Sequence, residues 1–453
     1  MKKDKIKLPG AAIGAGGRYS CFVTEHPALR ELRVDAARLA GVEFDGTAKA
    51  LLALSEEDRE AVEAHLRPLV EANRELLESE PENRIRVSEI RKGQNLILDQ
   101  GLNNVMTSYA WASAFQACAV GTGTTPTYVD SGSITATASS TTVTSSSSFF
   151  TSGMTGYLIK FDSGEERYIT FVSATTATLS SALTIGSPTL FTVYAVNQTG
   201  LDTETKRSNT YLTGSGNCGT SWTSTTSAQM RTYDFSIEGS NINYSELGWS
   251  DTTTSGNNLF SRTLIAGGTV TVLTGQGLRV VYTLTITVSS STSTGSFLIT
   301  GWPVAPSTVV TGSYSLGNPF GNTGSPPIGT VGTSGGSSVT NGCVYEIGPG
   351  PWSPNARLCT GSSLPAFGND YSAGTTALSD SGGRASYISG SFQRDYTFHF
   401  NLGSAVRTDW RGISLSLSTT NFVFVFDQAQ TKDNAHTLDF NVTIQVGRVL
   451  TNP

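Results

Sequence analysis

Three charged residues in the central part of the sequence are candidates for a polar group: Glu246, Arg262 and Arg279. Each lies in a run of strand-forming residues, so their side chains meet only if these strands are neighbours in one sheet. Such a group could contact a charged surface of a partner subunit. We favour the simpler prediction, a structural ion pair with a small net contribution to stability.

A cluster of carboxylates at Asp162, Glu165 and Glu166 lies in the segment DSGEE, at the expected tip of a hairpin. Carboxylate oxygens could bind a cation there. Clustered carboxylates at a turn are usually only solvated, and the ligand spacing of a calcium-binding loop is absent. We therefore predict no metal site.

His399 is a candidate general base, with Asp395 four residues before it. Along a strand this separation is ~13 Å, too far for Asp395 to orient the imidazole. The sequence contains no GxSxG, HExxH or P-loop motif. A polysaccharide depolymerase would need two carboxylates converging in a cleft, and no spacing predicts this. We predict no catalytic residue, no cofactor and a non-enzymatic protein.

Three tryptophans near loops, Trp302, Trp352 and Trp410, could stack on sugars. Tryptophans in such places more often anchor packing, which we favour here. Carbohydrate or receptor binding remains an alternative function.

The strands that would position these side chains are clearest in residues 278–288, where apolar residues alternate with Val281, Thr283, Thr285 and Thr287. This period of two indicates a strand with one face in a core. Similar runs surround it, separated by Gly, Asn and Ser. The fold class that we predict is mainly β, an antiparallel β-sandwich with an inserted small β-barrel domain and a short N-terminal α-helical segment.

The predicted organisation has four parts. Residues 1–23 are a flexible basic and glycine-rich arm, and residues 24–83 are an α-helical attachment segment. Residues 84–127 plus 197–453 form the interrupted sandwich, with a long Gly/Ser/Pro-rich loop region at 303–389. Residues 128–196 read as a self-contained small barrel inserted into a surface loop, since removing them joins two halves of one strand–loop–strand unit.

The helical segment has a capping-box pattern at Ser55 and Asp58. Its apolar spacing suits either a short coiled coil, as in a trimeric stalk, or two helices packed as a hairpin on a neighbouring domain. We favour the hairpin, because Pro68 should kink or restart the second helix. The arm and the helices supply the predicted subunit contacts: Lys2, Lys3, Lys5, Lys7, Leu29, Leu32, Leu66 and Leu69.

Composition excludes several functions. The net charge of −6 gives no reason to expect nucleic-acid binding. No apolar run approaches the ~18 residues that cross a bilayer, and the basic N-terminus lacks the apolar stretch of a secretory signal. Of the five cysteines, Cys343 and Cys359 lie in one loop-rich region where they could pair. Buried free thiols are expected for the others.

Three segments resemble a known family: residues 243–248 (NYSELG), 259–262 (LFSR) and 278–282 (LRVVY). They are similar to segments of tailed-bacteriophage structural proteins, in the tail-fibre-like and tail-tip-associated β-sandwich family. There, Asn-Tyr-x-Glu-(Ile/Leu)-Gly precedes a strand, Leu-Phe-Ser-Arg opens the next, and Leu-Arg-Val-x-Tyr follows. The resemblance covers roughly residues 84–127, 199–288 and the last fifty residues, but not the N-terminal helices.

The resemblance implies a structural component of a virion: a tail fibre, tail tip or collar protein assembled in the host cytoplasm. Its partners would be other virion proteins and copies of itself, as a trimer or a ring. A receptor- or glycan-binding module of the tail and a capsid decoration protein are the alternatives. The resemblance brings no catalytic residues.

Overall fold

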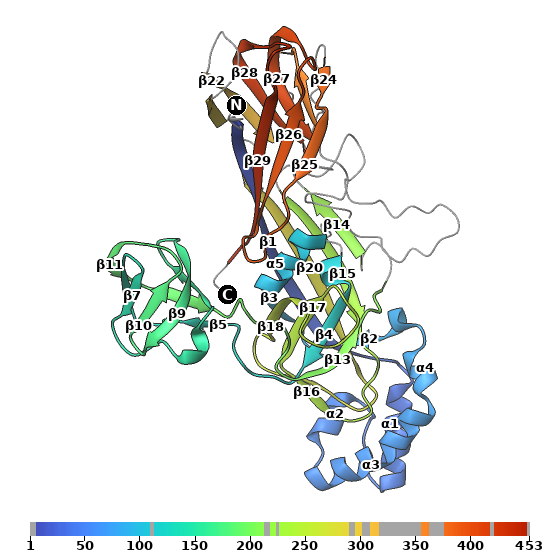
Figure 1. Cartoon of the computed structure of the whole chain (residues 1–453). Helices are drawn as coiled ribbons and strands as arrows, with labels where there is room; N and C mark the ends of the chain where they lie inside the picture. Colours follow the sequence, from blue (N-terminus) through green and yellow to red (C-terminus); the bar gives the residue numbers. More distant parts are fainter. Residues whose placement is uncertain are drawn as a thin grey trace, which may run out of the picture.

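The protein is mainly β in the computed structural model, with 47% of residues in strands and 17% in helices, which confirms the predicted fold class. The structure describes residues 6–108, 113–212, 218–222, 226–289, 295–300, 309–316, 355–361, 376–416 and 421–450. These residues form one long central sheet, a second sandwich layer at one end, a separate inserted sheet at the side and a cluster of helices at the other end (Figure 1).

The central sheet runs through nine strands in a mostly non-sequential order. In that order they are β13 (Glu204–Ser208), β4 (Ala117–Gly121), β17 (Glu246–Ser250), β18 (Leu259–Leu264), β3 (Arg91–Ile97), β1 (Ile6–Glu25), β20 (Gly277–Ser289), β15 (Thr226–Asp234) and β14 (Cys218–Trp222). Just after β13, the chain hydrogen-bonds to β15 through the Leu212 N–H and the Thr232 carbonyl oxygen, 2.9 Å apart. The two ends of this curled sheet are therefore brought together.

Strand β1 lies in the middle of this sheet, so the prediction of a flexible arm is wrong for residues 6–23. It pairs antiparallel with β20 over Ala12–Thr24, and parallel with β29 (Leu438–Arg448) in its first half. The sequence permits this because side chains on one face, such as Tyr19 and Cys21, are buried in the core. Lys2, Lys3 and Lys5 lie outside the described residues. Lys7 pairs with Asn441 in the register of β1 and β29.

Gly17 shows why the N-terminal strand is rich in glycine. A Cβ atom at this position would lie 1.8 Å from Asn95 Oδ1 and 2.4 Å from the Tyr282 hydroxyl oxygen. The Asn95 amide, which donates a hydrogen bond to Tyr282 at 3.1 Å, occupies that space. The glycine-rich segment around Gly17, which we predicted as a flexible arm, therefore packs tightly inside the sheet.

The upper sandwich forms around the first half of β1 (Figure 1). One layer adds β29, β26 (Gln393–Phe400) and β25 (Ser381–Arg384) to the central sheet, whereas β2 (Ile85–Arg86) pairs with the last residues of β1, near the helices. The other is a six-stranded sheet in the order β21 (Gly295–Thr300), β22 (Val309–Leu316), β28 (Asn421–Lys432), β27 (Arg407–Ser416), β23 (Asn355–Cys359) and β24 (Thr376–Leu378). Phe398 and Phe440 of the first layer share one core with Ile413 and Phe424 of the second.

Strands also occur within residues 303–389, which we predicted as a loop region. Strands β22, β23, β24 and β25 lie there, so the prediction is wrong for these four elements. They were missed because their sequences lack a sustained alternation of apolar and polar residues. The rest of that region lies outside the described residues, apart from short connections next to these strands.

The N-terminal helices form a lobe at the opposite end, which we call the helical lobe (residues 29–83). It contains α1 (Leu29–Ala40), α2 (Ala48–Ala53), α3 (Glu56–Ala72), α4 (Arg74–Glu78) and the short 3-10 helix η1 (Pro81–Asn83). The Ser55 hydroxyl accepts the Asp58 N–H at 3.1 Å, which confirms the predicted cap. Helix α3 continues through Pro68, so the expected restart of the helix there is wrong. Buried Leu66 and Val70 hold it against α1 on both sides of the proline.

The inserted sheet lies between β4 and β13, which pair directly with each other. Its order is β11 (Ile185–Thr189), β6 (Ala136–Ser139), β7 (Thr142–Ser145), β10 (Thr176–Leu179), β9 (Glu166–Ser173), β8 (Leu158–Phe161), β12 (Phe191–Tyr194) and β5 (Tyr128–Asp130), with η3 (Ser152–Met154) nearby. It has its own apolar core, which includes Phe150, Phe161 and Phe191. The sheet does not close on itself, so the expected barrel is open.

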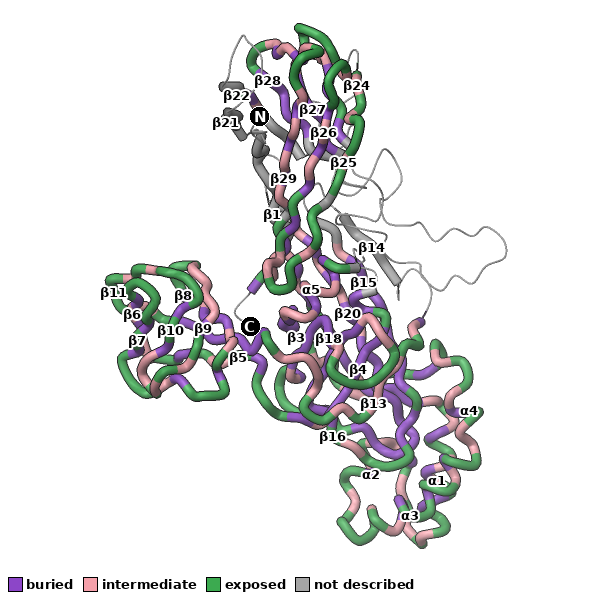
Figure 2. The backbone as a smooth tube through the Cα atoms, in the orientation of Figure 1, coloured by how far each residue is buried: buried purple, intermediate pink, exposed green. Residues whose placement is uncertain are grey.

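Three further elements complete the central part of the chain. Helix α5 (Asp99–Ser108) contacts β18, and the 3-10 helix η2 (Ser113–Phe115) follows it. Strands β16 (Ile242–Tyr244) and β19 (Val270–Val272) form a small separate pair. Figure 2 shows the resulting burial, which is concentrated in the strands of the central sheet.

Candidate functional site

Glu246 and Arg262 form a fully buried ion pair on adjacent strands. Glu246 begins β17 and Arg262 lies in the middle of β18, and both residues have 0% exposure. Arg262 Nη2 and Nε donate to Glu246 Oε2 at 2.8 and 3.0 Å. The two strands are neighbours, as the sequence reasoning required. The predicted structural pair is therefore present, although it is buried rather than a weak surface contact.

The Glu246 carboxylate also holds both linkers of the inserted sheet. Its Oε1 accepts the backbone N–H of Gly123, before the insertion, and that of Thr203, after it, each at 2.9 Å. Its Oε2 accepts the Asp202 N–H at 3.1 Å. A carboxylate that accepts several backbone N–H groups and faces a guanidinium has its charge well compensated despite burial. We call this group the linker clasp: Glu246, Arg262, Gly123, Asp202 and Thr203.

Arg262 extends the linker clasp to side chains of the second linker. Its Nη2 donates to Asp202 Oδ2 and its Nη1 to Gln198 Oε1, both at 2.8 Å. Because Gln198 immediately follows the last strand of the inserted sheet, the clasp fixes the place where that sheet leaves the central sandwich. Sequence reasoning identified the charged pair but not this role, because the linkers are far from Glu246 in sequence.

A second set of contacts attaches the inserted sheet to the C-terminal end of β29. The Tyr168 hydroxyl donates to Asp99 at 2.8 Å, and Arg448 pairs with the same carboxylate. Lys160 donates to the Leu450 carbonyl oxygen at 2.7 Å. Beneath these polar contacts is an apolar cluster shared by the inserted sheet, the central sheet and the C-terminal residues: Leu96, Leu98, Ala119, Leu158, Tyr194, Val196, Leu259 and Leu450. The inserted sheet is thus held at two sides.

Arg279 belongs to a different group from Glu246. It lies on β20 and donates to Asp234 Oδ1 at 3.0 Å, while Arg84 donates to Asp234 Oδ2 at 2.8 Å. Burial raises the pKa of the Asp234 carboxyl, and the two guanidinium groups oppose that rise. Burial likewise lowers the pKa of Arg84. This group joins the end of the helical lobe to the central sheet, since Arg279 also donates to the Pro81 carbonyl.

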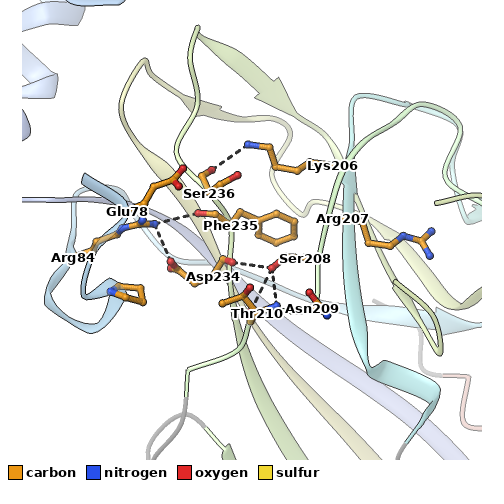
Figure 3. A pocket seen from close by; sticks show the side chains of 11 residues that line it. Glu78, Arg84, Lys206, Arg207, Ser208, Asn209, Thr210, Asp234, Phe235 and Ser236 are labelled. Atoms are coloured by element: carbon orange, nitrogen blue, oxygen red, sulfur yellow. Dashed lines mark hydrogen bonds and ion pairs between the residues drawn. The ribbon is translucent and has the colours of Figure 1, made fainter. Parts of the chain in front are cut away.

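A polar cavity of about 260 Å³ opens beside Arg84 and Asp234 (Figure 3). Lys206, Ser208 and Thr210 of the chain around β13 form its other wall. Lys206 pairs with Glu238 at 2.7 Å. Because the charged groups of its lining are satisfied by neighbouring protein groups, the cavity has the chemistry of a packed junction rather than of a ligand site.

Further buried contacts tie the helices to the central sheet. Arg33 of α1 pairs with Glu25 at the end of β1, at 2.9 Å, and the Gln276 amide donates to the same carboxylate at 2.9 Å. The Thr274 hydroxyl donates to Glu63 of α3 at 2.6 Å. These contacts therefore fix the position of the helical lobe relative to the central sheet.

The apolar residues predicted as subunit contacts lie inside this lobe. Leu29 and Leu66 have 0% exposure, and Leu32 and Leu69 pack against the same core, which also includes Ile237 and Leu273 from the central part of the chain. The prediction is wrong for Leu29 and Leu66, because their partners are within the same chain. Sequence periodicity identified an apolar face but could not show what covers it.

The other candidate residues are placed apart from one another. Asp162 is exposed, whereas Glu166 lies 3.9 Å from Lys160 and burial raises its pKa. His399 pairs with Asp439 on the neighbouring strand β29, while Asp395 accepts the Thr443 hydroxyl at 2.5 Å. No group of three or more His, Cys, Asp or Glu in the described part of the chain could hold a metal ion.

Trp410 has 1% exposure and donates its indole N–H to the Ala405 carbonyl oxygen at 2.7 Å, so it anchors packing and does not offer a face to a sugar. Trp302 and Trp352 lie outside the described residues.

The buried cysteines behave largely as expected. Cys21 and Cys118 are buried free thiols, and burial raises the pKa of Cys21 to about 12. Cys343 lies outside the described residues, so its pairing with Cys359 stays a prediction. A thiol with a raised pKa is a poor nucleophile at neutral pH.

Comparisons with protein-family models, with curated proteins and with solved structures find no match to this chain. Among the described residues, no helix is long and apolar enough to cross a membrane.

Proposed function

We propose that this chain is a non-enzymatic structural component of a bacteriophage tail: a fibre, tip or collar protein that acts by assembly with other subunits. The proposal rests on the resemblance of residues 243–248, 259–262 and 278–282 to tail proteins. In the fold these segments belong to β16 and β17, to β18 and to β20, which are parts of one structural unit.

The observation that carries the proposal is where the buried charges lie. The linker clasp holds the inserted sheet to the central sheet, and the Asp234 group holds the helical lobe. A buried pair that loses one partner is strongly destabilising, so such pairs fix the relative positions of the parts they join. Their use at junctions suits a protein that must present several lobes in a fixed arrangement to its neighbours.

The test is to locate the chain in purified particles. Intact particles, isolated tails and isolated heads of a phage that encodes this sequence are compared by quantitative mass spectrometry. We expect a fixed copy number per particle, with recovery in the tail fraction. Recovery in the head fraction alone would instead support a capsid decoration protein. Absence from particles, with the chain abundant in the infected lysate, would overturn the proposal.

A further inference from the structure

The helical lobe has an unpartnered acidic face. Its residues, 29–83, contain 14 Asp and Glu but 7 Lys and Arg, a net charge of −7 in a chain whose total is −6. On α3, the residues opposite buried Val62 and Leu66 are all exposed: Glu57, Glu60, Ala64, Pro68 and Glu71. Their spacing of three and four places them on one side of the helix.

This face presents Glu57, Glu60 and Glu71 around Ala64 and Pro68, with the exposed Arg67 at its edge. Among the described residues, Glu57 and Glu60 have no ion-pair partner, whereas Glu71 pairs with Arg74 at 2.9 Å. Large apolar side chains are also exposed on the other helices of the lobe: Leu39 of α1 (63%), Leu52 of α2 (53%) and Leu76 of α4 (49%). Carboxylates without ion-pair partners on an exposed helix face suit a basic partner.

The same chain carries a segment of the opposite charge at its other end. Lys2, Lys3, Lys5 and Lys7 surround a single acidic residue, Asp4. Strand β1 begins in the upper sandwich, whereas the helical lobe lies at the far end of the molecule (Figure 1). The start of β1 is therefore far from the acidic face of α3 in the same copy.

We propose that the acidic face of α3 binds the basic N-terminal segment, residues 1–5, of a second copy of this chain. Five extended residues span at most ~18 Å, and the face from Glu57 to Glu71 is ~21 Å long, so the two match in length. Contact between opposite ends is heterologous and generates a ring or a filament. A symmetric contact of two helical lobes would place acidic faces together, which like-charge repulsion disfavours. The proposal rests on the assembly role proposed above and names the partner.

Sedimentation velocity of the full chain at low and high salt tests the proposal. We expect self-association at ~20 mM NaCl that is lost at ~500 mM, because exposed charge pairs are screened. The variant Lys2→Glu/Lys3→Glu/Lys5→Glu and the variant Glu57→Lys/Glu60→Lys should each self-associate at least about tenfold more weakly. Equal association of either variant and the wild-type chain would overturn the proposal, as would a monomer at every salt concentration.

Mixing the two variants gives the decisive control. In the mixture, the acidic N-terminal segment of the first variant meets the basic face of the second, and the unchanged basic segment of the second meets the unchanged acidic face of the first. Association should therefore return in the mixture. The substituted glutamates are exposed, and an unchanged circular dichroism spectrum and melting curve check that the variants are folded. Failure of the mixture to associate would overturn the proposal, while the particle measurement tests the tail assignment separately.

Discussion

Substitution of Glu246 by glutamine should loosen the attachment of the inserted sheet. The carboxylate and Arg262 are both fully buried, and the carboxylate also accepts N–H groups from Gly123, Asp202 and Thr203. Removing one partner of a buried pair costs about 3–5 kcal/mol, because the other charge is left uncompensated. Glutamine keeps one oxygen acceptor for the linker amides, so we expect the lower end, about 3 kcal/mol.

Hydrogen exchange with mass spectrometry measures the loss of stability at each linker separately. A local measurement is needed because the lobes of this protein need not unfold in one transition. A loss of about 3 kcal/mol raises the local opening equilibrium roughly a hundredfold. We expect that increase in peptides covering residues 122–127 and 198–203, with unchanged protection of the strands within the inserted sheet.

The matched control is Glu204→Gln. Glu204 pairs with Arg207 on the same strand β13, at 2.8 Å, but does not hold the two linkers together. We expect it to affect both linkers less than Glu246→Gln does, because Arg207 keeps its hydrogen bonds to Thr252, Thr254 and Asn258. Equal exchange in the two variants would refute the conclusion that Glu246 fixes the insertion.

Three further changes have expected outcomes. Replacing residues 128–195 by a short glycine–serine linker should leave the cooperative unfolding of the remaining chain intact, because β4 and β13 pair directly with each other. Loss of that unfolding transition in calorimetry would contradict the prediction. Gly17→Ala should destabilise the chain by about 1–3 kcal/mol in urea, because its Cβ would overlap Asn95, and Asn95→Ala should recover part of the loss. The Asn401 N–H and the Ser404 hydroxyl donate to the Asp380 carboxylate and lower its pKa from the usual 3.8. The ionised carboxylate therefore stabilises the turn that contains Asn401 and Ser404 above about pH 4, and this stabilisation is lost as the pH falls through the lowered pKa. Amide exchange at Asn401 measures this, and Asp380→Asn should remove the pH dependence.

The strands that sequence could predict are those with a local alternating pattern. In β20, Val280, Tyr282, Leu284 and Ile286 are buried as the period of two indicated. The cap at Ser55 followed from local chemistry in the same way. Strand β1 was missed because its partners, β3, β20 and β29, lie tens to hundreds of residues away, and a glycine- and lysine-rich segment has no strand pattern of its own.

The candidate groups were predictable only in part. Glu246, Arg262 and Arg279 were named together as a polar group, on the condition that their strands are neighbours, and this holds for β17 and β18. Arg279 was assigned to the wrong carboxylate, since Asp234 and Arg84 are brought to it by pairing of β15 with β20 and by the end of the helical lobe. The hydrogen bonds of Glu246 to the linkers depend on tertiary structure alone.

The position of β1 has a consequence for how the chain is made. Its first half pairs with β29, which is synthesised more than 400 residues later. At about 5–20 residues per second, a ribosome needs roughly 20–90 s to reach that strand. During this time the beginning of the chain has no partner on that side, so the central sheet can be completed only near the end of translation. A chaperone that binds extended, unpaired segments would have its main opportunity on this protein during that interval.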